Sequence, residues 1–226
     1  IILKMLDGID RPAICTALPT KKGIMHMLDL GANIQCNSNH LVQFAYMGDA
    51  LVQSLEISER PVVGLLNVGS EDFKGNETIK ATAQLLQKSK LNYRGYVEGD
   101  EMFSGNYDLV VTDGFVGNIA LKSIEGVSNI ISHFIKDEFK KTMLTKILAL
   151  ISYPVMKSVK KRMDPRRYNG ASLLGLQGIV VKSHGGADSY AFSQAINTAY
   201  YEVKNNILEK IKVSIQKENQ IDAKVL

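Results

Sequence analysis

The stretch that decides the fold is Leu109–Lys122, LVVTDGFVGNIALK. Its first three residues are apolar and predict a buried strand, which stops at Asp113 and Gly114. Gly117 and Asn118 follow, and a helical pattern begins there. A strand that stops at a carboxylate, turns on glycine and leads into a helix gathers backbone N–H groups and polar side chains at one point. This is how α/β proteins build anion sites.

The same order of strand, turn and helix recurs along the chain. Strands are predicted at 12–18, 25–30, 62–68, 92–97, 109–112 and 178–182. Helices are predicted from about Ser38, after a cap at Asn76, from about Gly117, and over 188–211 before a polar tail. Strands that are apolar on both faces and alternate with helices predict an α/β fold, a three-layer αβα sandwich around a largely parallel twisted sheet.

The composition fits one α/β domain over residues 1–226, because 226 residues with 22% charged side chains are ordinary for a globular protein. The two cysteines, Cys15 and Cys36, have no zinc-like spacing and fit a reducing cytoplasm. The first residues, IILKMLDGID, resemble the end of a helix, so we expect a preceding portion to be missing.

Charge is concentrated in one segment. Residues 140–167 contain nine basic residues and one acidic residue, whereas the rest of the chain has 18 basic and 22 acidic residues. A basic block on an acidic body predicts a local contact with an anionic partner, and it does not indicate a nucleic-acid binder.

Four predicted strand ends carry a polar side chain close to glycine, namely Asn33, Asn67, Asp113 and His184. Because ligands of such sheets bind beyond the carboxyl ends of the strands, we expect these four ends to form one pocket. His184 is interpreted as a phosphate donor or an acid, or equally as a turn histidine bonded to the backbone.

The loop between Asn67 and Asn76 places Lys74 beside Gly75, just before a helix N-terminus. A lysine and a helix end together can hold phosphate or a developing oxyanion, although a lone loop lysine is often only solvated. Neither nucleotide-binding glycine motif is present, and Asp29 and Asp113 have no second carboxylate nearby in the sequence. No metal site and no cofactor are therefore predicted.

The basic segment 140–167 also contains an uncharged, largely apolar run. Between Lys146 and Lys157 lie ten uncharged residues, too few for a membrane span, which takes roughly 20 apolar residues. We expect a helical hairpin over residues 140–167. Its flanking cations suit an anionic bilayer surface or an acidic carrier protein. Its apolar side suits a dimer interface, which the sequence favours slightly over a membrane contact.

Several blocks then resemble one known family. LDLGAN (28–33), GLLNVGSEDFKGN (64–76), TDGFVGNIALKSIEG (112–126), YNGASLLGLQG (168–178) and KSHGGAD (182–188) are similar to the bacterial phosphate acyltransferases of phospholipid synthesis, the PlsX family. Ser172 stands where that family has proline, and the family's glycine-rich N-terminal turn has no counterpart here.

The resemblance implies a fold like those of isocitrate and isopropylmalate dehydrogenases and phosphotransacetylases, with this chain as the C-terminal part of a larger domain. It implies transfer of a fatty acyl group from acyl carrier protein to inorganic phosphate, by a cytoplasmic homodimer associated peripherally with an anionic membrane surface. A membrane glycerol-3-phosphate acyltransferase would consume the acyl-phosphate.

The resemblance also assigns roles to residues. Lys74 and Asn118 would be catalytic. The phosphate end would be shaped by Gly31, Asn33, Asn67, Gly75, Asn76, Asp113, Gly114, Gly117, His184 and Gly185. Contacts with acyl carrier protein or membrane would come from Lys146, Leu148, Ile151, Lys157, Lys160, Lys161, Arg162, Arg166 and Arg167.

Two alternatives stay open at this point. One is a decarboxylating dehydrogenase of similar fold, which requires a dinucleotide site and a cluster of metal-binding carboxylates. The other is a non-catalytic fragment that only docks on a membrane.

Overall fold

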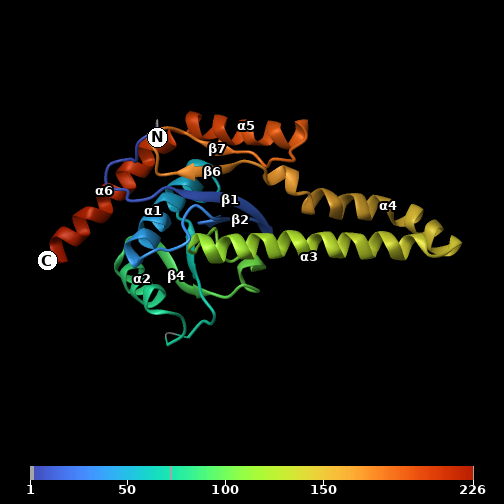
Figure 1. The fold of residues 1–226 in the computed structure, drawn as a ribbon, viewed down its shortest axis with the longest axis horizontal. Coiled ribbons are helices and arrows are strands. Elements are labelled where there is room, and N and C mark those ends of the chain that lie inside the picture. The colour runs from blue at the N-terminus through green and yellow to red at the C-terminus, as the bar shows by residue number, and fades with distance from the viewer. Residues whose placement is uncertain (1–2, 72, 226) are drawn as a thin grey trace. The chain divides into compact units, whose positions relative to one another are not determined.

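The computed structural model describes residues 3–71 and 73–225, with side chains up to residue 216. The chain forms two compact units, Ile1–Asn118 with Arg166–Leu226, and Ile119–Pro165. The first unit contains the sheet and the second is helical (Figure 1).

The first unit is built on one seven-stranded mixed sheet with strand order β4-β3-β5-β2-β1-β6-β7. The strands are β1 (Ala13–Thr20), β2 (Gly23–Leu28), β3 (Val62–Leu66), β4 (Asn92–Val97), β5 (Leu109–Val111), β6 (Ala171–Leu174) and β7 (Val181–Lys182). β2 to β5 pair in parallel, whereas the β2–β1, β1–β6 and β6–β7 pairings are antiparallel. Five of these seven strands therefore run in one direction, and β1 and β7 run against them.

Helices cover one face of this sheet. They are α1 (Ser38–Ser54), α2 (Glu77–Lys88), α5 (Ser189–Lys204) and α6 (Ile207–Val225). The core is formed by α1 with strand residues such as Cys15, Leu28, Leu65 and Val111, all of them buried. Because α1 lies between the sheet and α2 and α6, it buries most of its own residues.

The αβα prediction places helices on the opposite face of the sheet as well, but other residues cover that face. Tyr107 lies over Gly64, whose position would place a Cβ within 2.9 Å of the Tyr107 ring. Buried Met102, in the short helix η1 (Met102–Ser104), belongs to the same connection between β4 and β5. Within the described part of this unit, the third layer expected for an αβα sandwich is therefore a loop and not a layer of helices.

Most predicted elements match the structure, and four differ. Residues 3–10 are not helical, and Met5 forms a β-bridge with Leu176. The sequence reading missed β6, which pairs with β1. The predicted helix over 188–211 is two helices, because Asn206 adopts a left-handed conformation that ends α5. The expected polar tail continues α6 as far as Val225.

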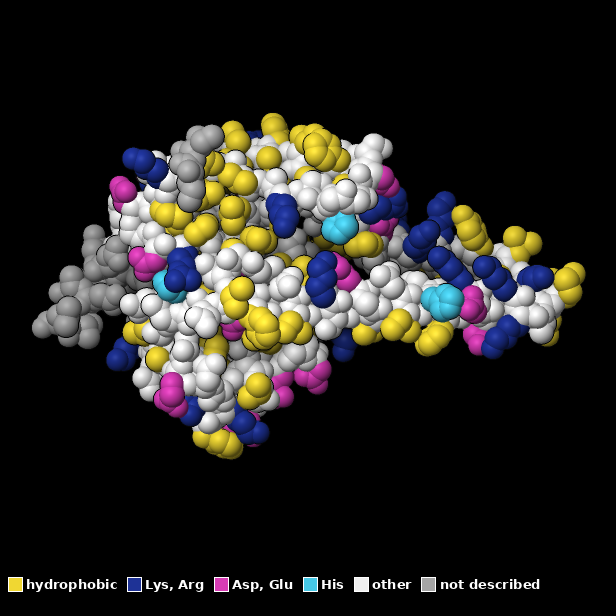
Figure 2. All heavy atoms as spheres, in the orientation of Figure 1, with side chains coloured by type: hydrophobic (Ala, Val, Ile, Leu, Met, Phe, Trp, Pro, Cys, Tyr) yellow, Lys and Arg dark blue, Asp and Glu magenta, His cyan; other side chains and the backbone are white. Residues whose placement is uncertain are grey.

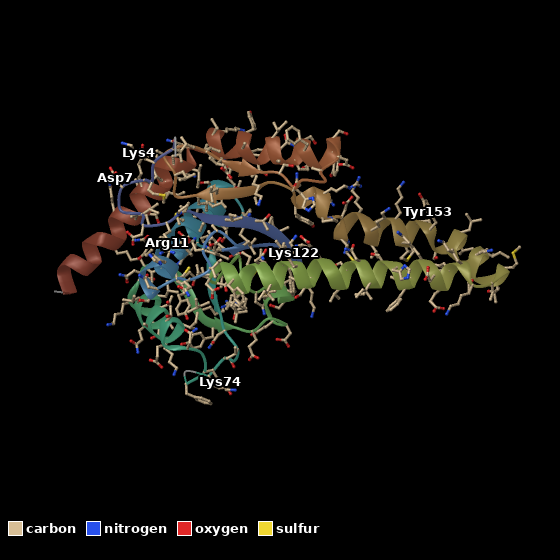
Figure 3. All side chains as sticks on the ribbon, in the orientation of Figure 1. Lys4, Asp7, Arg11, Lys74, Lys122 and Tyr153 are labelled. Atoms are coloured by element: carbon tan, nitrogen blue, oxygen red, sulfur yellow. The ribbon has the colours of Figure 1, made fainter. Side chains whose placement is uncertain are left out.

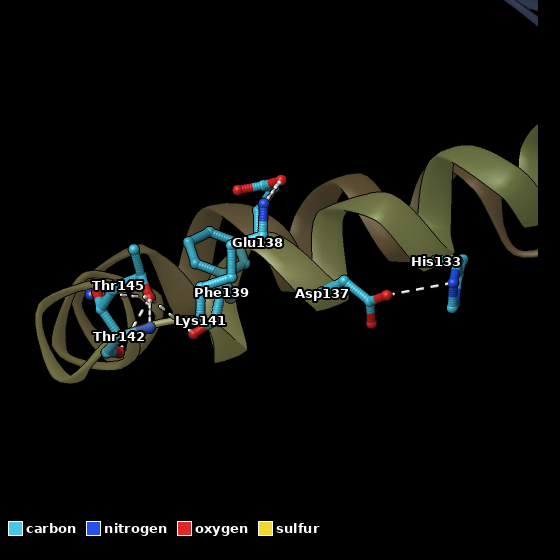
Figure 4. Close-up of polar contacts among 7 residues, drawn as sticks. All are labelled: His133, Asp137, Glu138, Phe139, Lys141, Thr142 and Thr145. Carbon is cyan, nitrogen blue, oxygen red and sulfur yellow. Dashed lines mark hydrogen bonds and ion pairs between the residues drawn. The ribbon is translucent and has the colours of Figure 1, made fainter.

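The second unit consists of most of α3 (Gly114–Lys140) and of α4 (Met143–Met163), joined by Lys141 and Thr142. Figure 4 shows this turn, in which the Thr142 side chain caps α4 and the Thr145 hydroxyl donates to the Phe139 carbonyl at 3.2 Å. The hairpin thus begins before residue 140, because its first helix is α3, and Pro154 lies inside α4. None of the described helices is both long and apolar enough to cross a membrane.

Two glycines of α3 allow a matched test of the packing between α3 and the β2–α1 connection. A Cβ at Gly117 would overlap the carbonyl oxygen of Asp29, whereas a Cβ at Gly126 meets no atom within 4 Å. We expect Gly117→Ala to destabilise the protein by roughly 1–3 kcal/mol or more, because the backbone must move. Gly126→Ala should be neutral or stabilise by up to about 1 kcal/mol, since alanine favours helix.

Urea unfolding of both variants measures the difference. Equal unfolding midpoints for Gly117→Ala and the unmodified chain would show that α3 does not pack closely on Asp29.

Candidate functional site

The carboxyl ends of β2, β5 and β3 meet at one edge of the sheet, and a buried carboxylate organises that edge. Asp29, which follows β2, is fully buried. Its Oδ1 accepts from the backbone N–H groups of Ile14 at 2.9 Å and Ala32 at 3.1 Å. Its Oδ2 accepts from the Asn33 backbone N–H at 2.8 Å and from Asn33 Nδ2 at 2.9 Å. Four donors on one carboxylate replace the water lost on burial.

Asn33 is held entirely within this network. Its Nδ2 also donates to the Pro12 carbonyl at 2.7 Å, and its own carbonyl accepts from the Gly114 N–H at 2.8 Å. The side chain is 7% exposed. Asn33 was predicted to shape the phosphate end. Its side-chain amide instead forms hydrogen bonds that join the start of β1 to the β2–α1 connection, and its carbonyl joins this connection to α3.

The exposed polar group at this edge is Asn118. It lies in the second turn of α3, beside the exposed Gly31, and no described residue accepts or donates a hydrogen bond to its side chain. Gly31 has φ 120°, a conformation that favours glycine, and a Cβ there would lie 3.5 Å from the Cβ of Asn118. Asp113 accepts from the Val116 N–H at 2.9 Å and so caps α3. The structure thus brings five of the predicted residues together, namely Gly31, Asp113, Gly114, Gly117 and Asn118.

The β3–α2 connection forms a second group on the same edge. Asn67 Nδ2 donates to the carbonyls of Gly69 at 3.0 Å and Lys74 at 3.3 Å, which fixes the base of the loop. A Cβ on Gly75 would crowd the Asn67 side chain, and Gly75 has φ 90°. Asn76 accepts from the Ile79 N–H at 2.9 Å as the cap of α2. Asn67, Gly75 and Asn76 therefore build the loop that carries Lys74.

Lys74 itself contacts side chains of its own loop. Its ammonium lies 3.9 Å from Glu71 Oε1 and 5.7 Å from the centre of the Phe73 ring, and its side chain is 41% exposed. Figure 3 shows Lys74 at the lower margin of the view, well apart from Arg11, which donates to the Gln35 carbonyl beside the Asp29 network. Lys74 and Asn118 both follow the carboxyl ends of parallel strands, and the expectation that they line one cradle stays a prediction.

His184 and Gly185 lie at the other end of the sheet, which corrects their predicted place. They follow β7, and β7 runs opposite to β2, β3 and β5. The His184 N–H donates to Asn169 Oδ1 at 2.9 Å, and His184 Nδ1 accepts from the Gly186 N–H at 3.0 Å. The prediction failed because it took β7 as a further parallel strand.

The cations of the basic segment have two different surroundings. Arg166 forms an ion pair with Asp188 at 2.7 Å and stacks over the Tyr190 ring at 5.5 Å, so it fixes the start of α5. The five cations of α4 and the predicted apolar contacts Leu148 and Ile151 are all exposed, and α4 has no buried residue. Figure 2 shows these blue cations crowded beside yellow apolar side chains on the segment formed by α3 and α4.

A buried acid that the sequence analysis did not predict lies on α5. Glu202 on α5 is 1% exposed and accepts a short hydrogen bond from the Ser172 hydroxyl. Burial raises the pKa of Glu202 to about 7, and the Ser172 hydrogen bond opposes that rise. Cys15 lies close by, and burial raises the pKa of its thiol. No group of three or more His, Cys, Asp or Glu side chains is placed to hold a metal ion within the described residues.

A family model and individual relatives identify the same family for this chain. A sequence model of the family described as "Fatty acid synthesis protein" matches residues 1–210. A protein named phosphate acyltransferase from Methylococcus capsulatus is 55% identical over 93% of this chain, and the chain covers 62% of that relative. Its namesake from Alkalilimnicola ehrlichii is 55% identical over 91% of this chain and 60% of the relative. The chain therefore spans about three fifths of the length of these relatives.

Solved structures show a similar fold. A phosphotransacetylase from Streptococcus pyogenes has a TM-score of 0.54 at 16% identity, with 90% of this chain and 57% of that chain covered. The EutD phosphotransacetylase from Staphylococcus aureus has a TM-score of 0.53 at 14% identity, with 96% and 57% covered. At such low identity, the likeness extends to the fold alone.

The Glu202 carboxyl predicts a pH dependence of stability. Its folded pKa of about 7 exceeds the ordinary value of 4.5, so between these pH values the folded protein holds a proton that the unfolded chain releases. Stability should therefore fall as the pH rises from about 4.5 to about 7, by on the order of 2 to 3 kcal/mol at 1.36 kcal/mol per pKa unit.

Glu202→Gln keeps a partner for Ser172 and removes the titration, so its urea midpoint should change less between pH 5 and 7. Glu209→Gln, at an exposed carboxylate paired with Lys212, serves as the control. An unchanged pH slope in Glu202→Gln would contradict the assignment.

Proposed function

Because the chain belongs to the fatty acid synthesis protein family, we propose that it is part of a phosphate acyltransferase, which moves a fatty acyl group from acyl carrier protein to inorganic phosphate. The observation that carries the proposal is the identity of 55% over more than nine tenths of this chain with relatives of that name. The acyl-phosphate would pass to a membrane glycerol-3-phosphate acyltransferase.

The chemistry demands little of the protein. A phosphate oxygen attacks the carbonyl carbon of the thioester, the carbonyl oxygen becomes an oxyanion, and the C–S bond then breaks. The sulfur leaves as a thiolate and takes a proton from solvent. Phosphate is already an anion and a thiolate is a good leaving group, so no protein nucleophile is needed. The protein must orient phosphate and stabilise the oxyanion.

The carboxyl edge of the sheet suits this task. The Asn118 amide is exposed beside Gly31, and it is proposed to donate to the thioester oxyanion. Lys74 is proposed to neutralise phosphate. This role requires its ammonium to leave Glu71, and an exposed pair 3.9 Å apart contributes little free energy that would oppose the change.

The remaining predicted residues at this edge would act as scaffold. Their side chains already serve the fold: Asn33 holds the β2–α1 connection beside Asn118, and Asn67 and Asn76 hold the loop that carries Lys74. Asp113 caps α3, so phosphate bound at that helix end would meet a carboxylate. We therefore place phosphate on the Lys74 side of the edge.

The α3–α4 hairpin is proposed to serve the same enzyme as a docking surface at the membrane or in a homodimer. Large apolar side chains of α4 such as Leu148 at 49% and Ile151 at 71% exposure lie in an uncharged run that cations flank at both ends. An apolar surface flanked by lysine and arginine favours an anionic bilayer, and the cations also suit an acidic carrier protein.

This same exposed helix favours a second candidate, a non-catalytic membrane-docking protein. The names of the relatives favour the acyltransferase over both this candidate and a decarboxylating dehydrogenase. Incubation with acyl-phosphate and reduced acyl carrier protein separates the candidates, because only an acyltransferase forms the acyl-carrier thioester by the reverse reaction.

Lys74→Ala and Asn118→Ala test the proposed roles. Each should lower turnover in that reverse assay at least 100-fold, because each removes a group that stabilises developing charge. The thermal midpoint should stay within a few degrees, since both side chains are partly exposed. Lys88→Ala, at the exposed end of α2, is the control and should keep full turnover. Near-normal turnover in Lys74→Ala would refute the role of that lysine.

Flotation on liposomes tests the hairpin. The unmodified protein should float with anionic vesicles and not with neutral ones, and Leu148→Glu combined with Ile151→Glu should abolish flotation by placing charge in the apolar surface. Ser158→Glu on the same helix is the control for added charge. Sedimentation reports the mass of each variant. Undiminished flotation of the double variant, with the mass unchanged, would rule out membrane docking through these side chains.

A further inference from the structure

A cavity of about 320 Å³ lies at the end of the sheet opposite to the carboxyl ends of β2, β3 and β5. Its walls come from β1, the first half of β2, the last turn of α1, the residues before β6 and one side of α5. All of these belong to one compact unit. The cavity is therefore distinct from the edge that carries Asn118.

The inner wall holds a polar atom without a partner. His26 on β2 lines the cavity and is only 4% exposed, and its Nδ1 forms no hydrogen bond within the described residues. A buried nitrogen without a partner is destabilising, and most such atoms in folded proteins are satisfied. A ligand that hydrogen-bonds the imidazole would remove this penalty.

The inner wall is also uncharged near neutral pH. Burial lowers the pKa of His26 to about 4, so its imidazole is neutral. Cys15, also in the wall, keeps its proton because burial raises the pKa of its thiol. Arg167 is a cation of the lining, and it lies at the exposed rim, away from the buried inner wall. An ionised group placed against His26 would lose water without gaining a charged partner.

The other walls divide into a polar and an apolar part. Gln194 and Asn197 on α5 line the cavity, and their side-chain amides form no hydrogen bond within the described residues. Facing them are Ile24, Leu51 and Leu55, which line the cavity from β2 and α1. A cavity that joins apolar side chains to several polar groups suits a ligand with one apolar and one polar part.

We propose that this cavity binds an uncharged amphiphile, a short aliphatic chain ending in a primary amide, with the chain against Ile24, Leu51 and Leu55 and the amide at His26. An amide both donates and accepts, as a neutral imidazole and the amides of α5 do. Hexanamide is of suitable size, since its eight non-hydrogen atoms need about 240 Å³ at roughly 30 Å³ each, the share of a water molecule.

Hexanamide and hexanoate, which differ in charge and little in shape, form a matched pair of probes. Titration of the full chain, followed by NMR chemical shifts, should show saturable binding of hexanamide at least tenfold tighter than that of hexanoate. His26→Phe fills similar volume without nitrogen and should weaken hexanamide binding at least tenfold. No phosphate or acyl donor is present, so the result is independent of the proposed acyl transfer.

Asn197→Leu gives a second test. Because Asn197 is exposed, its replacement leaves the packing of the core intact, and it should weaken hexanamide binding several-fold. Ser193→Leu, on the same helix and outside the cavity, should leave binding unchanged. The proposal is overturned if hexanamide does not saturate, if hexanoate binds equally well, or if Asn197→Leu and a folded His26→Phe both bind hexanamide normally.

Discussion

The fully buried carboxylate of Asp29 is the constraint on which the rest of the structure depends. It accepts four hydrogen bonds from β1 and from the residues that lead from β2 to α1. A charge removed from water persists only when its hydrogen bonds are replaced, so this geometry tolerates little change. Because Gly114 and Gly117 pack against Asn33 and Asp29, the same carboxylate also fixes where α3 begins and hence the position of Asn118.

The parallel half of the fold could be predicted from the sequence because its signals are local. The apolar run at 109–111, the caps at Asn76 and Asp188 and the start of α1 near Ser38 all match the structure. These features depend on residues close together in the chain. The glycines near Asn118 were also placed correctly at one edge, because parallel strands carry their ends to the same side.

What the sequence reading missed depends on pairings between distant segments. Strand β6 is short and pairs with β1 over 150 residues away, so periodicity alone gave no sign of its direction. That direction decides the place of His184, since two antiparallel pairings in succession turn β7 against the parallel strands. The Ser172–Glu202 pair and the cavity at His26 follow from the same pairings. Lys74 was correctly placed on a loop at the edge, but no pattern indicates where a long exposed side chain points.

The path of the chain through the hairpin has a mechanical consequence. The segment 119–165 leaves the sheet unit after Asn118, at the carboxyl end of β5, and returns at Arg166, next to the start of β6 at the opposite end. A strand of five to six residues is about 17–20 Å long, so any shorter replacement for this segment must still bridge that height. A force applied to segment 119–165 is therefore transmitted to the sheet unit at both ends of the sheet, through Asn118 and through Arg166.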